Sequence, residues 1–135
     1  MIGILIIAHG SLGESMLDCA KHVWGKEPQQ LASLAVSIHD DPNALLQKAN
    51  ALVAALNSGD GVLVLSDMYG ATPCNIVGKL LDPGVVEGIA GVNLPMLIRT
   101  ITYRQEPLMT LIEKAVSGGR EGVVHFNRES CERYD

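Results

Sequence analysis

Apolar residues gather in five short runs along the chain. These runs cover residues 2–8, 31–38, 61–66, 85–92 and 122–126. In the first run every residue is glycine, alanine or a larger aliphatic residue, a pattern typical of a strand buried on both faces of a parallel sheet. The other four runs are interpreted in the same way. The pattern therefore predicts five strands.

Between the runs, apolar residues recur every three or four positions, as they do on one face of a helix. Helices are predicted over residues 12–24, 42–56, 73–81 and 95–116. Ser11 and Glu14 have the spacing of a capping box, so Ser11 is expected to cap the first helix with its side chain. Pro107 should interrupt or kink the last helical segment, because proline has no amide donor, and Gly118-Gly119 should end it.

Strand and helix alternate four times before the last strand, which predicts an α/β layer structure with a parallel sheet and right-handed crossovers. A chain of 135 residues suits one domain, which we assign to residues 1–127. Residues 128–135 are expected to form a charged tail. No stretch has the length of a membrane helix or the pattern of a signal peptide, so a cytoplasmic protein is expected.

Composition excludes several classes of function. The net charge is −5, from 10 basic and 15 acidic residues, which argues against nucleic acid as the main partner, since phosphate binding needs a basic face. The glycines form neither a phosphate-binding loop nor a dinucleotide fingerprint. The cysteines are too far apart for a zinc motif and are expected to be reduced thiols. We therefore expect no cofactor and no metal.

Reactive side chains follow two of the predicted strands, and the carboxyl ends of parallel strands are where sites form in α/β sheets. His9, Gly10 and Ser11 follow the first strand, and Asp67 follows the third. A lone histidine there is more often an ordinary surface residue, but a facing carboxylate changes that balance. Asp67 could bind one ring nitrogen of His9 and leave the other as a nucleophile.

The predicted site is suited to a phosphoryl group. Gly10 allows close approach of the backbone, and the free amides at the helix that follows Ser11 would hold an anion on His9. Thr72, in the loop after Asp67, could add a hydroxyl donor. These five residues are the predicted site: His9 and Asp67 as the catalytic pair, and Gly10, Ser11 and Thr72 as the phosphoryl-binding residues.

Two segments carry a resemblance to a known family. GILIIAHGSLGESML near the start and VLVLSDMYGATPCN in the middle resemble the IIA components of the mannose class of the bacterial phosphoenolpyruvate-dependent sugar phosphotransferase system. The second segment is close to the family pattern D-[LM]-[FY]-G-[GA]-T-P-x-N. The resemblance implies that His9 is the phosphorylated histidine, that Asp67 orients it, and that Thr72 lines the same pocket.

The resemblance also implies partners and an assembly. The phosphoryl donor would be the phosphohistidine of HPr, and the acceptor a IIB domain or subunit; the IIC and IID subunits would provide the link to the membrane. The fold would be an open three-layer sandwich of four parallel strands. Residues 122–126 would form a fifth, antiparallel strand that is exchanged between the subunits of a homodimer. Since the chain ends soon after that strand, a separate IIB partner, or a system without its full transporter, is expected.

Other functions remain open from the sequence. The chain could pass phosphate to a dihydroxyacetone kinase, or act as a regulatory phosphorelay module, with the same His9 chemistry. A different class is also possible, because small tetrapyrrole metal chelatases also begin with a strand that ends in His-Gly-Ser. Those enzymes need a second histidine beside the first, where this sequence supplies Asp67.

Overall fold

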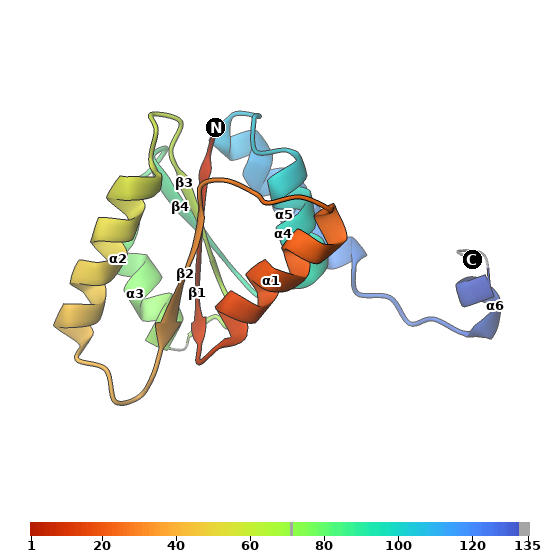
Figure 1. Ribbon diagram of the computed structural model, residues 1–135, viewed down its shortest axis with the longest axis horizontal. Helices are drawn as coiled ribbons and strands as arrows, with labels where there is room; N and C mark the ends of the chain where they lie inside the picture. Colours follow the sequence, from red (N-terminus) through yellow and green to blue (C-terminus); the bar gives the residue numbers. More distant parts are fainter. Residues whose placement is uncertain (71, 133–135) are drawn as a thin grey trace.

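The four predicted parallel strands form one sheet in a computed structural model, which describes residues 1–70 and 72–132. The strands are β1 (Gly3–His9), β2 (Leu31–Val36), β3 (Val62–Ser66) and β4 (Val86–Ala90). Their order in the sheet is β2-β1-β3-β4, and every pair is parallel (Figure 1). The two strands that precede the predicted site, β1 and β3, are therefore neighbours.

Helices cover both faces of this sheet (Figure 1). They are α1 (Leu12–Trp24), α2 (Pro42–Leu56), α3 (Thr72–Leu80), α4 (Leu94–Thr102), α5 (Leu108–Glu121) and the short α6 (Arg128–Glu132). Successive side chains of β1 point to opposite faces. Ile4 and Ile6 pack in the core under α1, α4 and α5, whereas Leu5 and Ile7 pack in the core under α2 and α3. In the part of the chain that the structure describes, none of the helices has the length and apolar character needed to cross a membrane.

The last predicted helix is two helices that pack against each other. Pro107 interrupts the segment as expected and stands at the cap of α5. The prediction that Gly118-Gly119 ends the helix is wrong, because α5 continues to Glu121. A Cβ atom on Gly118 would lie 2.9 Å from Cβ of Arg99 on α4. The glycines therefore serve close packing between α4 and α5, and this need outweighs their poor helix propensity.

Ser11 stands at the N-cap of α1, but its side chain makes no capping hydrogen bond. The capping-box prediction is therefore wrong. The backbone explains the difference, because Ser11 has φ −90° and ψ 6°, whereas a capping side chain reaches the amides of the first turn from an extended backbone. The Ser11 hydroxyl is left free of that role.

The C-terminal segment projects away from the body of the molecule (Figure 1). Residues 123–127 have no regular secondary structure, and Val123, Val124 and Phe126 are 77%, 64% and 67% exposed. The fifth strand expected over residues 122–126 is not formed within the single chain and stays a prediction for an assembly. Residues 128–132 of the expected tail form α6, and residues 133–135 lie outside the described residues.

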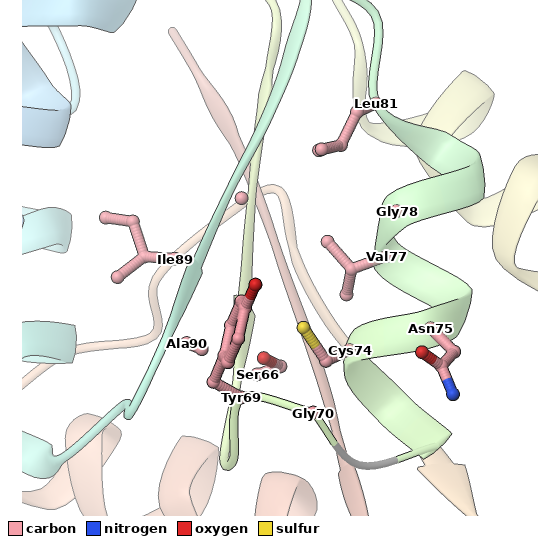
Figure 2. A pocket seen from close by; sticks show the side chains of 11 residues that line it. Ser66, Tyr69, Gly70, Cys74, Asn75, Val77, Gly78, Leu81, Ile89 and Ala90 are labelled. Carbon is pink, nitrogen blue, oxygen red and sulfur yellow. The ribbon is translucent and has the colours of Figure 1, made fainter.

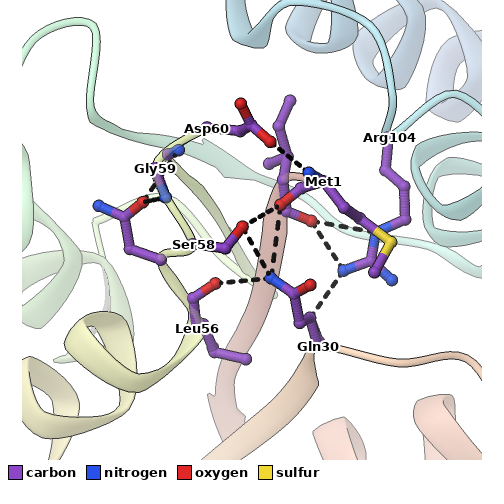
Figure 3. Close-up of polar contacts among 10 residues, drawn as sticks. Met1, Gln30, Leu56, Ser58, Gly59, Asp60 and Arg104 are labelled. Carbon is purple, nitrogen blue, oxygen red and sulfur yellow. Dashed lines mark hydrogen bonds and ion pairs between the residues drawn. The ribbon is translucent and has the colours of Figure 1, made fainter.

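Arg104, which follows α4, binds the opposite end of the sheet from the predicted site (Figure 3). Its side chain is buried, and its guanidinium donates hydrogen bonds to the backbone carbonyls of Ile2, Gln29 and Gln30. The Gln30 amide in turn donates to the carbonyl of Leu56 at 3.0 Å. Burial lowers the pKa of Arg104 to about 10, so the group stays charged at neutral pH. These bonds satisfy carbonyls at the amino ends of β1 and β2.

Candidate functional site

The sheet register places His9 and Asp67 beside each other. β1 and β3 pair in parallel with Ile7 opposite Ser66. His9 is the last residue of β1, and Asp67 directly follows β3. Because parallel strands end at the same edge of a sheet, both side chains emerge at its carboxyl edge. The structure thus brings together the two residues predicted to form the catalytic pair.

Asp67 binds His9 at two points. Oδ2 of Asp67 lies 2.9 Å from Nδ1 of the His9 ring and 3.1 Å from the backbone nitrogen of His9. The other oxygen, Oδ1, accepts a hydrogen bond from the Met68 amide at 2.9 Å. The bond to the His9 amide was not foreseen from the sequence. It fixes the carboxylate to the strand end and so fixes the ring relative to the sheet.

The Asp67 carboxylate is held in its charged form. Its side chain is only 10% exposed, and this burial alone would raise its pKa. Hydrogen bonds from the His9 ring and the His9 amide, with the charge of His9, outweigh burial and lower the pKa of Asp67 below its ordinary value. At neutral pH the carboxylate is therefore ionised, and it can only accept hydrogen bonds.

This protonation state determines the tautomer of His9. Since ionised Asp67 only accepts, Nδ1 of His9 must carry the hydrogen of the 2.9 Å bond. In the neutral ring, Nε2 then keeps its lone pair. The His9 side chain is 45% exposed, so a reactant can reach it. Asp67 thus orients the His9 ring through Nδ1, and Nε2 is the ring nitrogen that can act as a nucleophile.

Gly10 and Ser11 form the turn between β1 and α1. Gly10 has φ 55°, a conformation that favours glycine, and its amide donates to the Val36 carbonyl at 3.1 Å. Ser11 is exposed, and its carbonyl accepts the first helical hydrogen bond of α1, from Ser15. The turn therefore directs the amino end of α1, with its unpaired amides, to the edge of the sheet that carries His9.

Thr72 lies at the same edge but outside the pair. It is the first residue of α3 and is exposed. Hydrogen bonds join neither His9 nor Asp67 to Thr72. Between Asp67 and α3, Met68 and Tyr69 are exposed, and Gly70 has φ 84°. The loop therefore frames the site on the side opposite α1.

A pocket that we did not foresee opens beside this loop (Figure 2). It has a volume of about 430 Å³ and lies between α3 and β4; we call it the α3–β4 pocket. Cys74 and Val77 point into it from α3, and Tyr69 stands at its side (Figure 2). Ser66, the neighbour of Asp67, also lines it. No pattern in the sequence indicated this pocket, because Cys74 was expected only to be a reduced thiol.

The described residues at this edge of the sheet do not form a ligand set for a metal ion. Across residues 1–70 and 72–132, no three or more His, Cys, Asp or Glu side chains gather closely enough to hold a metal ion. The second histidine that a chelatase would need beside His9 is replaced in the structure by Asp67. The site is therefore organised around one imidazole and one carboxylate.

Comparison with known proteins gives a consistent family. A family model described as "PTS system fructose IIA component" matches residues 3–116. The mannose-specific EIIAB component of the phosphotransferase system from Escherichia coli K12 is 33% identical over 135 residues, which cover 98% of this chain and 42% of that protein. A protein of the same description from Shigella flexneri matches equally. The chain thus spans less than half the length of these relatives.

Solved structures agree with the sequence comparison. Component EIIA of the phosphotransferase system from Streptococcus agalactiae superimposes with a TM-score of 0.82 at 25% identity, covering 93% of this chain and 98% of that one. The mannose/sorbose-specific IIA subunit from Enterococcus faecalis superimposes with a TM-score of 0.81 at 22% identity, covering 93% and 95%. The second likeness, at that identity, concerns the fold alone.

Proposed function

The chain belongs to the family of fructose- and mannose-type IIA components of the phosphotransferase system, and on that premise we propose that it carries a phosphoryl group on Nε2 of His9. One observation gives the strongest support for His9 as the phosphorylated residue. The 2.9 Å bond between Nδ1 and Asp67 leaves Nε2 as the basic nitrogen of an exposed ring. Phosphoryl transfer needs such a nucleophile in a fixed orientation.

The proposed reaction is an exchange between two histidines. The lone pair of Nε2 attacks the phosphorus atom of phosphorylated HPr, and the N–P bond of HPr breaks. The electron pair of that bond returns to the HPr ring nitrogen, which then binds a proton. Phosphorylation at Nε2 gives the His9 ring imidazolium character, and the nearby Asp67 carboxylate stabilises that charge through Nδ1–H.

Gly10, Ser11 and Thr72 are proposed to bind the phosphoryl oxygens. Gly10 acts through its conformation, because its own amide is already bonded to Val36. Ser11 has a hydroxyl that makes no capping bond, and the first turn of α1 that follows it offers unpaired amides. Thr72 offers a hydroxyl from the opposite side, at the start of α3.

The proposed acceptor is a IIB domain or subunit. Relatives that align with 98% of this chain are named EIIAB components, which supports an acceptor of the B type. In this proposal the protein works in the cytoplasm and reaches the membrane only indirectly, through IIC and IID subunits. The domain would end near residue 127.

The proposed assembly is a homodimer in which residues 122–126 form the exchanged fifth strand. Two features of the chain support it. The segment projects from the body and exposes Val123, Val124 and Phe126 (Figure 1). β4 is the outer strand of the sheet on that side of β3. Beyond Val86, which Asp82 bridges, its far edge is paired with no other strand in the described residues, so another strand could add there.

Reconstituted transfer tests the proposal directly. The chain is mixed with phosphoenolpyruvate, enzyme I and HPr, and acid-labile phosphate is mapped by peptide digestion. Label should reach His9, depend on HPr, and disappear in His9→Ala. His22→Ala, which changes an exposed histidine on α1, is the matched control and should be labelled normally. Label that persists in His9→Ala would place the nucleophile elsewhere.

The acceptor is tested in the same mixture. Addition of a purified IIB protein from the same organism should remove the label from His9 and transfer it to IIB. Transfer to a dihydroxyacetone kinase subunit and not to IIB would overturn the acceptor while keeping His9 as the carrier. Absence of both transfers, with His9 fully labelled, would favour a regulatory relay.

A further inference from the structure

Arg104 carries a buried positive charge that is balanced by neutral groups. The residue is 4% exposed, and all acceptors of its guanidinium are backbone carbonyls (Figure 3). None of the ion pairs found within residues 1–70 and 72–132 includes it. Carbonyl dipoles replace only part of the hydration that a buried cation loses. The surroundings of Arg104 therefore favour an anion.

One N–H group of this guanidinium has no acceptor in the described part of the chain. Nε donates to the Ile2 carbonyl, and Nη2 donates to the carbonyls of Ile2 and Gln30. Nη1 donates to the Gln29 carbonyl alone. Because each terminal nitrogen of a guanidinium carries two hydrogens, one hydrogen of Nη1 is available to a ligand.

A pocket of about 350 Å³ borders Arg104; we call it the Arg104 pocket. It lies where α1 and α4 end, and Trp24 and Thr102 line it. Gln29, the acceptor of Nη1, lines it as well. The volume is within the range that holds a small ligand. Since Arg104 binds the amino ends of β1 and β2, the pocket and His9 are at opposite ends of the sheet.

The wall of the pocket combines cations with an apolar surface. Lys26 adds a second cation, and its Nζ lies 4.8 Å from the centre of the Trp24 ring. Among the described residues that line the pocket, Glu27 has the only carboxylate, and this carboxylate lies 3.1 Å from Nζ of Lys21. Trp24 and Ile101 supply apolar surface. Such a wall suits a ligand with one anionic group and a short apolar part.

We propose that the Arg104 pocket binds a small organic acid, whose carboxylate accepts hydrogen bonds from Nη1 of Arg104 and Nζ of Lys26. A carboxylate has two oxygens, so it can accept from both groups at once. The short carbon chain of the acid packs against Trp24 and Ile101. Glu27 repels a ligand with a second negative charge, so a monocarboxylate is preferred over a dicarboxylate.

Trp24 reports binding, because it is the single tryptophan of the sequence and lines the pocket. Its fluorescence is followed while butyrate is added at constant ionic strength, with 1-butanol as the uncharged probe of equal chain length. Butyrate should give a saturable change and 1-butanol should not. Equal responses to the two probes would show apolar binding only and would overturn the proposal. Tighter binding of succinate or of inorganic phosphate would overturn the preference for a monocarboxylate.

Lys26→Gln removes one proposed contact and leaves the bonds of Arg104 to the carbonyls in place. Loss of a charge-assisted hydrogen bond should weaken butyrate binding by about 10-fold. Lys79→Gln, at an exposed lysine of α3 that does not line the pocket, is the matched control and should bind as wild type. Butyrate should accordingly raise the thermal midpoint of this control more than that of Lys26→Gln. Equal binding by the two variants would overturn the proposal.

The contact with Arg104 is tested in the unaltered protein. With arginine labelled in carbon-13 and nitrogen-15, the guanidinium resonances of Arg104 should shift with butyrate at the same half-saturation as Trp24 fluorescence. A saturable fluorescence change without a shift of Arg104 would place the ligand elsewhere and overturn the proposal.

The inference does not rest on the proposed phosphoryl carrier, and the two are tested separately. Labelling of His9 by phosphorylated HPr is measured in the same preparations. Normal labelling in a protein that does not bind butyrate would refute the Arg104 pocket as a binding site and leave the carrier intact. Butyrate binding at Arg104 without labelling of His9 would support the pocket and refute the carrier.

Discussion

Oδ2 of Asp67 accepts hydrogen bonds from both the ring and the backbone amide of His9, although 58 residues separate the two in the chain. The same oxygen thus joins the orientation of the imidazole to the position of the strand end. Rotation of the His9 ring would break the bond between Nδ1 and Oδ2, while the bond from the His9 backbone amide would still hold the Asp67 carboxylate in place. This arrangement keeps Nε2 in one direction without a hydrogen bond to Nε2 from any of the described residues.

Asp67→Asn should slow phosphoryl transfer without removing the nucleophile. The amide oxygen can still accept from Nδ1, but it carries no charge to stabilise the phosphorylated ring. Loss of one charge-assisted bond corresponds to a decrease of about 10- to 100-fold in the rate of transfer from HPr. Rapid-quench measurement of His9 labelling gives that rate. A rate equal to wild type would show that the charge of Asp67 does not stabilise the phosphorylated ring.

The pair should also make stability depend on pH in acid. The folded pKa of Asp67 is lowered, so its contribution to the free energy of unfolding is present above the ordinary aspartate value of about 4. That contribution is lost as pH falls through the lower folded value. Urea unfolding of wild type and Asp67→Asn should therefore differ at pH of about 6 and converge as the pH falls well below the ordinary aspartate value of about 4. Asp18→Asn, at an exposed position on α1, should show no such convergence.

Two cap positions should respond differently to alanine. Asn93 caps α4 by accepting from the Met96 amide at 2.9 Å, so Asn93→Ala should lower the free energy of unfolding by about 1–2 kcal/mol. Ser11 makes no such bond, and Ser11→Ala should stay within about 0.5 kcal/mol. Thermal unfolding measures both. If Ser11 binds the phosphoryl group, its variant should nonetheless transfer phosphate more slowly; unchanged transfer would remove Ser11 from the site.

Glycines of two helices should give opposite results when changed to alanine. A Cβ atom on Gly118 would lie 2.9 Å from Cβ of Arg99, so Gly118→Ala should destabilise the protein by about 1–3 kcal/mol. Gly78 on α3 has no atom within 4 Å of that position, and Gly78→Ala should stabilise by about 0.5–1 kcal/mol. Denaturant midpoints measure both. Equal effects would mean that contact with Arg99 does not decide the choice of glycine.

The strands and the contact between His9 and Asp67 could be predicted because they depend on local patterns and on one rule of topology. Uniform aliphatic runs identify buried strands, and neighbouring parallel strands end at one edge, which brought His9 and Asp67 together. The parallel pairing of the strands could be predicted without knowing which side chains contact one another. The predicted ends of α1 and α2 were similarly close to those of the structure, since capping residues and glycine mark them locally.

The predictions that failed, and the features that were missed, depend on contacts between distant parts of the chain. Gly118 and Gly119 look like helix breakers until Arg99 and Met96 on α4 are seen to fill the space beside them. The capping role of Ser11 failed on a backbone angle that no sequence pattern encodes. The α3–β4 pocket lies between two elements that pack closely at Gly88, where a Cβ atom would lie 2.7 Å from Val77 on α3. The sequence alone shows Gly88 only as one residue of a predicted strand.

Arg104 adds a temporal order to this fold. The carbonyls of Ile2, Gln29 and Gln30 directly precede the first two strands that a ribosome releases, yet the guanidinium that binds them lies 74 to 102 positions later. Domains tend to fold as units during synthesis. Before Arg104 is synthesised, the carbonyls of Ile2 and Gln29 lack this donor, whereas the Gln30 carbonyl also accepts from the Ile4 amide at 3.0 Å. The first half of the sheet is therefore incompletely bonded early in translation. The hydrogen bonds at the amino end of the sheet can be completed only after residue 104 has emerged from the ribosome. A residue synthesised late therefore completes the bonding of strands synthesised first.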